Sequence, residues 1–218
     1  MNTDVGFMHE IKNCLSNIYA LSDMIDNDPK ETITLIKESI EQIKNIEQDY
    51  DIYTKTGTVP VVKLPIGMGR LLSSIIAEYS DQAAEKNITI KTDYKNLRVI
   101  SDQTKLRQIL SNLISNAIKY NKPNGSVLIE FKKYTSKFVI CVYDTGIGMT
   151  PNEIAKLGQP FFRCKKLDVP GTGLGWSIVK QLVDVLGGQI TVDVKDLKNV
   201  KDPIGTTYTT KITFIHPI

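Results

Sequence analysis

The sequence predicts an α+β fold in which an N-terminal helical hairpin precedes a sheet that is covered by helices on one face. Two apolar stripes with helical spacing occupy the first quarter of the chain, and the remainder alternates helices with short strands that pair mostly antiparallel. Gly57 and Pro60 interrupt the chain between these two parts. The 218 residues, of which 41% are hydrophobic and 23% charged, suit one or two compact domains.

Charge and composition exclude several classes of protein. The net charge of +3 is too small to indicate a nucleic-acid binder, although residues 1–58 carry five Lys against eleven acids and the rest of the chain is basic. The longest apolar run, near 138–143, is too short to span a membrane, and charged residues interrupt any signal peptide. The widely spaced Cys14, Cys141 and Cys164 suit free thiols rather than a disulfide or a zinc site. We therefore expect a soluble, cytoplasmic protein with no membrane segment and no nucleic-acid partner.

The first quarter of the chain predicts two amphipathic helices joined by a tight turn. Apolar residues recur at steps of three and four from Met8 to Ile25 and again from Ile33 to Tyr53, and Pro29 suits the first turn of the second helix. Two helices alone cannot enclose both stripes. The hairpin either packs against the rest of the chain or pairs with a second copy, as a four-helix bundle in a homodimer.

Beyond the break, periodicity and turn residues predict the elements of the larger part. An irregular segment that contains proline and glycine separates the last helix from the strands before it. The predicted elements are a helix over 67–86, strands over 88–93 and 97–101, a helix over 102–121, strands over 126–133 and 137–144, a helix over 173–187, and strands over 188–194 and 206–215.

Four polar residues interrupt one face of the predicted helix 102–121. Asn112, Asn116, Lys119 and Tyr120 lie beside its apolar stripe. Asn is a poor helix former, so two of them one turn apart in a helix interior need a reason. Solvent exposure is the simplest one. The functional interpretation is that an amide oxygen ligates Mg²⁺ without adding negative charge beside a triphosphate, with Lys119 nearby for phosphate.

The segment Asp144-Thr-Gly146-Ile-Gly148 closes a predicted strand. A carboxylate held at such a turn can accept a hydrogen bond from the exocyclic amine of adenine, which guanine cannot offer at that position. The same pattern also occurs in ordinary strand-ending turns. The segment therefore indicates a base pocket only in combination with other features.

A second glycine-rich segment, Gly171-Thr172-Gly173-Leu174-Gly175, opens a predicted helix. The free backbone N–H groups and the positive dipole end of a helix start suit phosphate oxygens. The segment matches neither the dinucleotide fingerprint nor a Walker A loop, so alone it is weak evidence.

The order and spacing of these segments resemble the N, G1, F and G2 boxes of the ATP-binding domain shared by histidine kinases, gyrase, Hsp90 and MutL. The stretch Pro160-Phe161-Phe162-Arg163 matches the F box, and the resemblance spans about residues 64–218. It implies an α/β-sandwich, Bergerat-type ATP-binding domain over 59–218, with Asn116 as the Mg²⁺ ligand, Asp144 as the adenine acceptor and residues 150–170 as a lid over the phosphates. The ATP-binding residues implied in this way are Asn112, Asn116, Lys119, Tyr120, Asp144, Gly146, Gly148, Arg163, Gly171, Thr172, Gly173, Leu174 and Gly175.

The first helix distinguishes among members of that superfamily. The segment from Phe7 to Ile18 resembles the H-box of two-component sensor histidine kinases. The resemblance implies that residues 1–58 are a dimerisation and phosphotransfer hairpin and that His9 is the phosphoacceptor. Glu10 would orient the ring or take its proton, and Asn13 resembles the family's phosphatase residue. The implied activity is ATP- and Mg²⁺-dependent autophosphorylation, followed by transfer to an Asp of a response-regulator receiver domain.

Three positions depart from the family's pattern, and two other functions stay open. Cys14 stands where many relatives have Pro, Gly158 replaces a common Phe, and Trp176 replaces a usual Leu. None of these changes removes a residue that the chemistry needs. The alternatives are a non-catalytic dimeric phosphotransfer scaffold, and an ATPase or protein serine kinase of the same superfamily.

Overall fold

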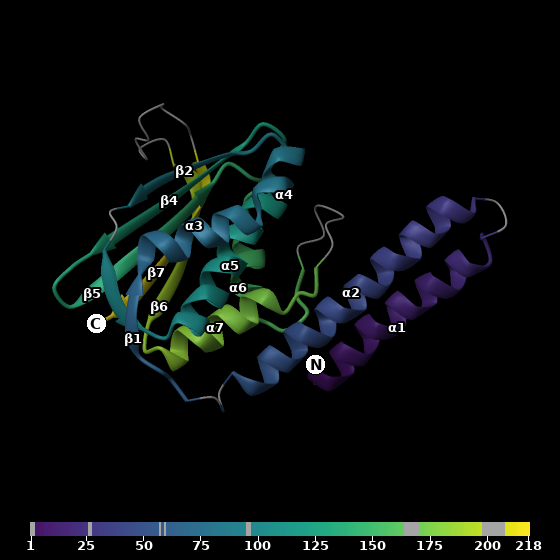
Figure 1. The fold of residues 1–218 in the computed structure, drawn as a ribbon, viewed down its shortest axis with the longest axis horizontal. Helices are drawn as coiled ribbons and strands as arrows, with labels where there is room; N and C mark the ends of the chain where they lie inside the picture. Colours follow the sequence, from purple (N-terminus) through teal and green to yellow (C-terminus); the bar gives the residue numbers. More distant parts are fainter. Residues whose placement is uncertain are drawn as a thin grey trace.

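The chain consists of a helical hairpin and a layered unit in which helices cover one face of a sheet (Figure 1). The computed structural model describes residues 3–25, 28–56, 58, 60–94, 97–163, 171–197 and 208–218. The hairpin projects from the helical side of the layered unit, so the helix layer lies between the hairpin and the sheet. This architecture confirms the predicted α+β class.

Helices α1 (Thr3–Ser22) and α2 (Pro29–Lys55) pack against each other to form the hairpin. At the start of α2 the Asp28 carboxylate accepts a hydrogen bond from the backbone N–H of Glu31 at 3.1 Å. Pro29 occupies the first turn, where its missing N–H costs nothing, as the sequence predicts.

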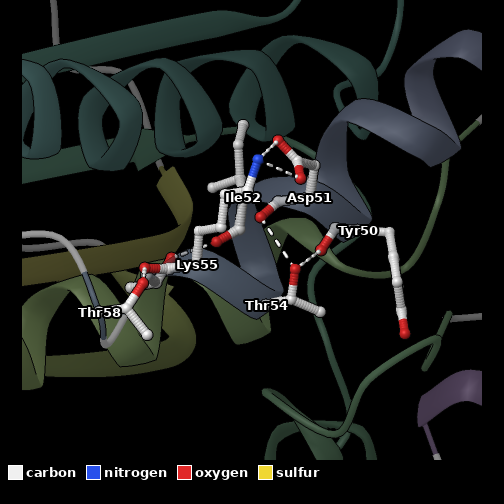
Figure 2. A network of polar contacts seen from close by, with 7 residues as sticks. Tyr50, Asp51, Ile52, Thr54, Lys55 and Thr58 are labelled. Atoms are coloured by element: carbon white, nitrogen blue, oxygen red, sulfur yellow. Dashed lines mark hydrogen bonds and ion pairs between the residues drawn. The ribbon is translucent and has the colours of Figure 1, made fainter.

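Side-chain hydroxyls mark the end of α2. Thr54 donates to the carbonyl of Tyr50 at 3.0 Å, and Thr58 donates to the carbonyl of Lys55 at 2.8 Å (Figure 2). Carbonyls in the last turn of a helix have no partner within the helix, so the bond from Thr58 satisfies that of Lys55 in place of a further turn. The helix therefore ends at the break that the sequence predicts near 55–60.

The hairpin buries only part of its apolar stripe. Ile46 is fully buried, and Tyr50 and Tyr53 pack against the core of the layered unit, because the C-terminal half of α2 runs alongside α7 (Figure 1). Leu15 and Ile40 each keep 43% of their surface exposed. Packing against the rest of the chain thus covers one end of the stripe and leaves the other end open.

The main sheet has five strands in the order β2-β4-β5-β7-β6. Only β2 and β4 pair parallel, which agrees with the mostly antiparallel pairing that the sequence predicts. Two further strands, β1 and β3, form a separate antiparallel pair. The strands are β1 (Leu64–Gly67), β2 (Thr89–Tyr94), β3 (Arg98–Ser101), β4 (Ser126–Lys133), β5 (Lys137–Asp144), β6 (Gln189–Leu197) and β7 (Tyr208–Pro217).

Helices of the layered unit bury their apolar faces against this sheet and form the main core. Leu110 and Ile114 of α5 (Gln103–Lys119) and Phe138 of β5 are fully buried there. Burial of such side chains is the main favourable term in folding, at roughly 1.5–3 kcal/mol each. The helices of the layered unit are α3 (Met68–Glu78), α4 (Ser80–Glu85), α5 (Gln103–Lys119), α6 (Pro151–Lys156) and α7 (Gly175–Val185).

The structure departs from the predicted elements at three places. The single helix predicted over 67–86 is two helices, because the chain leaves helical geometry at Tyr79, whose hydroxyl bonds Ser111 on α5 at 2.8 Å. Strand β1 and helix α6 lie in segments where the sequence predicts no regular element. Both are short, and α6 is stabilised by a capping box in which Thr150 and Glu153 bond each other's backbone N–H groups.

The two cysteines among the described residues, Cys14 and Cys141, are buried free thiols, as predicted. The third, Cys164, lies outside the described residues, as do Gly57 of the predicted break and residues 164–170 of the predicted lid.

Candidate functional site

A cavity of about 1350 Å³ lies between the hairpin and the helix layer. Its walls come from α2, α5, the end of β5, the segment after α6 and the start of α7. All but two of the thirteen predicted ATP-binding residues line it; the exceptions are Gly146 and Leu174. Segments that are far apart in the sequence therefore meet in one place.

The polar face of α5 forms one wall of the cavity. The Asn112 amide donates to the carbonyl of Gln108 at 3.0 Å, and its oxygen faces Gly175 at the start of α7. A Cβ on Gly175 would lie 2.6 Å from that oxygen, so only glycine lets the two helices approach this closely. Asn116, one turn further on, lines the cavity and is only partly exposed. Exposure to solvent alone therefore does not explain an Asn at this position of the helix.

The Asp144 carboxylate lies at the end of β5 and lines the cavity. It is only 8% exposed, and it accepts a hydrogen bond from the backbone N–H of Gly146 at 2.8 Å. Burial raises the pKa of Asp144 to about 6, although the hydrogen bonds from Gly146 and the Thr210 hydroxyl act in the opposite direction. The carboxylate thus combines high desolvation with a remaining capacity to accept, which suits recognition of an amine on a ligand.

The turn after Asp144 needs glycine for steric reasons. A Cβ on Gly146 would lie 2.4 Å from the carbonyl oxygen of Tyr120, and the N–H of Ile147 donates to the same oxygen at 3.2 Å. Gly148 adopts a positive φ of 61°, which other residues rarely adopt. The turn is therefore held against the end of α5, which fixes the position of Asp144 relative to the Asn side chains of that helix.

The glycine-rich loop forms the end of the cavity beside α7. Gly173 has φ +71°, and a Cβ there would meet the backbone of Phe161 at 2.7 Å. The N–H of Leu174 donates to the Thr172 hydroxyl at 3.1 Å, while the Leu174 side chain is fully buried in the core and anchors the loop. The N-terminus of α7, with its free N–H groups, therefore faces the cavity and suits an anion.

One residue of the site, Asp49 of α2, was not predicted. Its carboxylate accepts a hydrogen bond from the Thr172 hydroxyl at 2.6 Å. Burial raises the pKa of Asp49, opposed by the Thr172 bond and by the charge of Lys119, and burial lowers the pKa of Lys119. The sequence does hold a signal, since Asp49 follows Ile46 by three residues and precedes Tyr53 by four, which puts an acid on the apolar stripe.

His9, Glu10 and Asn13 do not line the cavity. His9 is exposed on α1, and the Asn13 amide nitrogen lies 3.0 Å from its Nδ1. The first turn of α1 does reach the segment after α6, because Gly6 packs directly on the Phe161 ring. His9 therefore lies one turn from the rim of the site without entering it.

Two further predicted features have a defined place. Arg163 lines the cavity, and the described part of the predicted lid also contributes Met149, Leu157 and Phe162 to its wall. Trp176 packs against the core, and its indole nitrogen is a buried donor without a partner among the described residues. No helix in the described ranges is both long and apolar enough to cross a lipid bilayer.

Comparison with known proteins identifies the layered unit. A model of the histidine kinase-, DNA gyrase B- and HSP90-like ATPase family matches residues 101–216. The circadian input-output histidine kinase CikA of Synechococcus elongatus is 30% identical over 205 residues, which cover 85% of this chain and 27% of that protein. The chain spans about a quarter to a half of the length of the curated relatives that it matches.

Solved structures agree with this result. The mycobacterial sensor histidine kinase MprB is 27% identical, with a TM-score of 0.59 over 72% of this chain and 97% of that chain. The histidine kinase ThkA, in complex with the response regulator protein TrrA, shares the fold of both parts, with a TM-score of 0.76, 21% identity and coverage of 96% of this chain and 59% of that chain. The chain therefore belongs to the histidine kinase-, DNA gyrase B- and HSP90-like ATPase family, and it is the catalytic core of a two-component sensor histidine kinase.

Proposed function

We propose that the chain is an ATP-dependent protein histidine kinase that autophosphorylates on His9 and passes the phosphoryl group to an Asp of a response-regulator receiver domain. In this proposal residues 1–58 form the dimerisation and phosphotransfer hairpin, and residues 59–218 form the catalytic ATP-binding domain. The observation that supports it most is the convergence of Asn116, Asp144 and the loop 171–175 on one cavity beside the hairpin that carries His9.

The cavity has a base end and a phosphate end. Asp144 would accept a hydrogen bond from the adenine amine, and Lys119 with the N–H groups of the glycine-rich loop would bind the phosphate oxygens. Bound Mg²⁺ would neutralise negative charge on the phosphates. Asn116 would contribute a neutral amide oxygen to it.

The reaction needs one neutral imidazole nitrogen. The His9 nitrogen attacks the γ-phosphorus of ATP, a P–N bond forms, and the bond from the γ-phosphorus to the bridging oxygen breaks, so that ADP leaves. If the Asn13 amide turns its oxygen toward Nδ1, it accepts the Nδ1–H and leaves the lone pair of Nε2 free to attack. Glu10 would take the ring proton that is lost after the P–N bond forms.

The same hairpin provides surfaces for two partners. The open part of its apolar stripe, which includes Leu15, Ile33 and Ile40, supports pairing with a second copy as a four-helix bundle. A receiver domain would approach His9 on its exposed face, and the complex of ThkA with a response regulator supports this kind of partner. Asn13, beside the ring, would orient a water that hydrolyses the phospho-aspartyl product.

Phosphate chemistry tests the proposal directly. The wild-type protein and the His9→Gln variant are incubated with γ-labelled ATP and Mg²⁺, with Ser16→Ala, on the same exposed face, as the control. We expect acid-labile, base-stable label on the wild type and on the control and none on His9→Gln. Label that persists in His9→Gln refutes the assignment, and acid-stable label indicates a serine kinase. Absence of ATP binding by calorimetry indicates a scaffold.

A further inference from the structure

The contact between Asp49 and Thr172 joins the hairpin to the glycine-rich loop across 123 residues of sequence. Thr172 is the second residue of that loop, and its hydroxyl also accepts the N–H of Leu174. Asp49 therefore holds the conformation of the loop that starts α7. It is a carboxylate from the hairpin at the end of the cavity where the anion-binding groups gather.

The surroundings of Asp49 make negative charge costly, so a second negative charge beside it is disfavoured. Its carboxylate is buried enough that desolvation raises its pKa, and Lys119 provides the nearby positive charge. The same Lys119 and the same helix start are the groups that would bind phosphate. Screening is weak for partly buried charges, so a phosphate and the carboxylate would repel each other at this end of the cavity.

We propose that Asp49 is a nucleotide-discriminating latch, which occupies the anion-binding end of the ATP site while the hairpin is docked and which a nucleotide must displace in proportion to its phosphate charge. This inference rests on the proposed ATP-binding function. It assigns to α2 a role in deciding which nucleotide binds. It also means that the contact of the hairpin with the loop weakens the binding of a triphosphate.

The chain offers variants that separate charge from shape. Asp49→Asn removes the charge, and its amide oxygen can still accept the Thr172 hydroxyl. Asp51→Asn makes the same change two residues away, where the exposed carboxylate pairs with Lys55 at 2.7 Å and does not line the cavity. Asp49→Glu keeps the charge. Thermal unfolding of each variant shows whether the fold is retained.

The test is calorimetry of ATP, ADP and adenosine binding to the wild type and the three variants, with Mg²⁺ present. A latch predicts that Asp49→Asn binds ATP about tenfold more tightly than the wild type, ADP more tightly by a smaller factor, and adenosine equally well. Asp51→Asn and Asp49→Glu should stay within about twofold of the wild type for all three ligands.

Two results would overturn the latch while leaving the proposed function intact. One is an unchanged or weaker ATP affinity in Asp49→Asn, which would mean that the carboxylate is neutral for binding or assists it. The other is equal tightening for ATP and adenosine, which would mean that the effect is not one of phosphate charge. If no protein in the set binds ATP, the proposed function fails and the latch fails with it.

Discussion

Replacing Asp144 with Asn should stabilise the nucleotide-free protein while abolishing its preference for adenine. Burial raises the pKa of this carboxyl from 3.8 to about 6, so keeping it ionised at neutral pH costs about 3 kcal/mol, from roughly 1.4 kcal/mol per unit. Asn removes the charge. Its oxygen can accept the Gly146 N–H, and the Thr210 hydroxyl can accept from its amide instead of donating. The melting temperature should therefore rise, by up to about 10 °C for a chain of this size.

The sign of this effect depends on pH. Because the folded-state pKa lies above the unfolded value, the wild type gains stability as pH falls from about 6 toward 3.8, whereas the Asp144→Asn variant lacks this gain. Thermal unfolding of both proteins at pH 7.5 and pH 5 should show a difference that shrinks at the lower pH. An equal or lower melting temperature for the variant at pH 7.5 would refute the argument that the buried charge is costly.

The same substitution tests the base pocket. With its oxygen on Gly146, the new amide would present N–H groups to the adenine amine, and the lost charged hydrogen bond should weaken ATP binding by about 100-fold. The N–H groups can instead donate to the carbonyl oxygen of guanine, so the ratio of GTP to ATP affinity should rise. The wild type should also bind ATP less tightly below pH 6, where the carboxyl takes up a proton. Retention of full ATP affinity in the variant would remove Asp144 from the site.

Three further substitutions test the surrounding structure. Gly173→Ala should destabilise the protein by about 2 kcal/mol or more and abolish ATP binding, because Gly173 has a positive φ and lies against the backbone of Phe161. Gly171→Ala is the control: a Cβ there meets nothing within 4 Å, so this variant should bind ATP normally in calorimetry. Asp102→Ala should lower the free energy of unfolding by about 2–4 kcal/mol in urea titrations, since this buried N-cap carboxylate pairs with a buried lysine, and Asp102→Asn should lose less. Burial lowers the pKa of His216 below 6.5, so protonation favours the unfolded state. The wild type should therefore lose stability relative to His216→Phe as pH falls below about 6.5. A stability difference between the two proteins that does not change with pH would contradict the lowered pKa.

Long periodic elements were predictable, and short ones were not. The apolar stripe along the 17 residues of α5 runs from Leu106 to Ile118, so its period predicts both the helix and its inward face. Strand β1 has four residues and exists because it pairs with β3, and nothing in its own sequence specifies that partner. Helix α6 has a local signal, the Thr150 capping box followed by Pro151, although it lies within a segment that is predicted to be irregular.

The nucleotide site was predictable to the extent that its residues are unusual for their local element. Paired Asn residues in a helix interior and glycines around a helix start conflict with propensity, which marks them for a role other than packing. Asp49 conflicts less with the propensity of its helix, because a single acid on a helix surface is ordinary. Only its position on the apolar stripe of α2 is unusual. Its partner, Thr172, comes from the other end of the chain, and only the fold brings the two together.

The contacts around Asp49 also link the nucleotide site to the helix turn that carries His9, the proposed phosphoacceptor. Tyr50, the next residue, stacks on Phe7 with ring centroids 4.2 Å apart and donates a hydrogen bond to Asp4, so the end of α2 and the first turns of α1 form one packed unit. His9 lies two residues beyond Phe7 on that unit and outside the cavity. If Asp49 acts as the proposed latch, a nucleotide that displaces it would separate this packed unit, which carries His9, from the glycine-rich loop. Because His9 lies outside the cavity while the hairpin contacts the loop, the proposed phosphoryl transfer would require the hairpin to move relative to the ATP-binding domain.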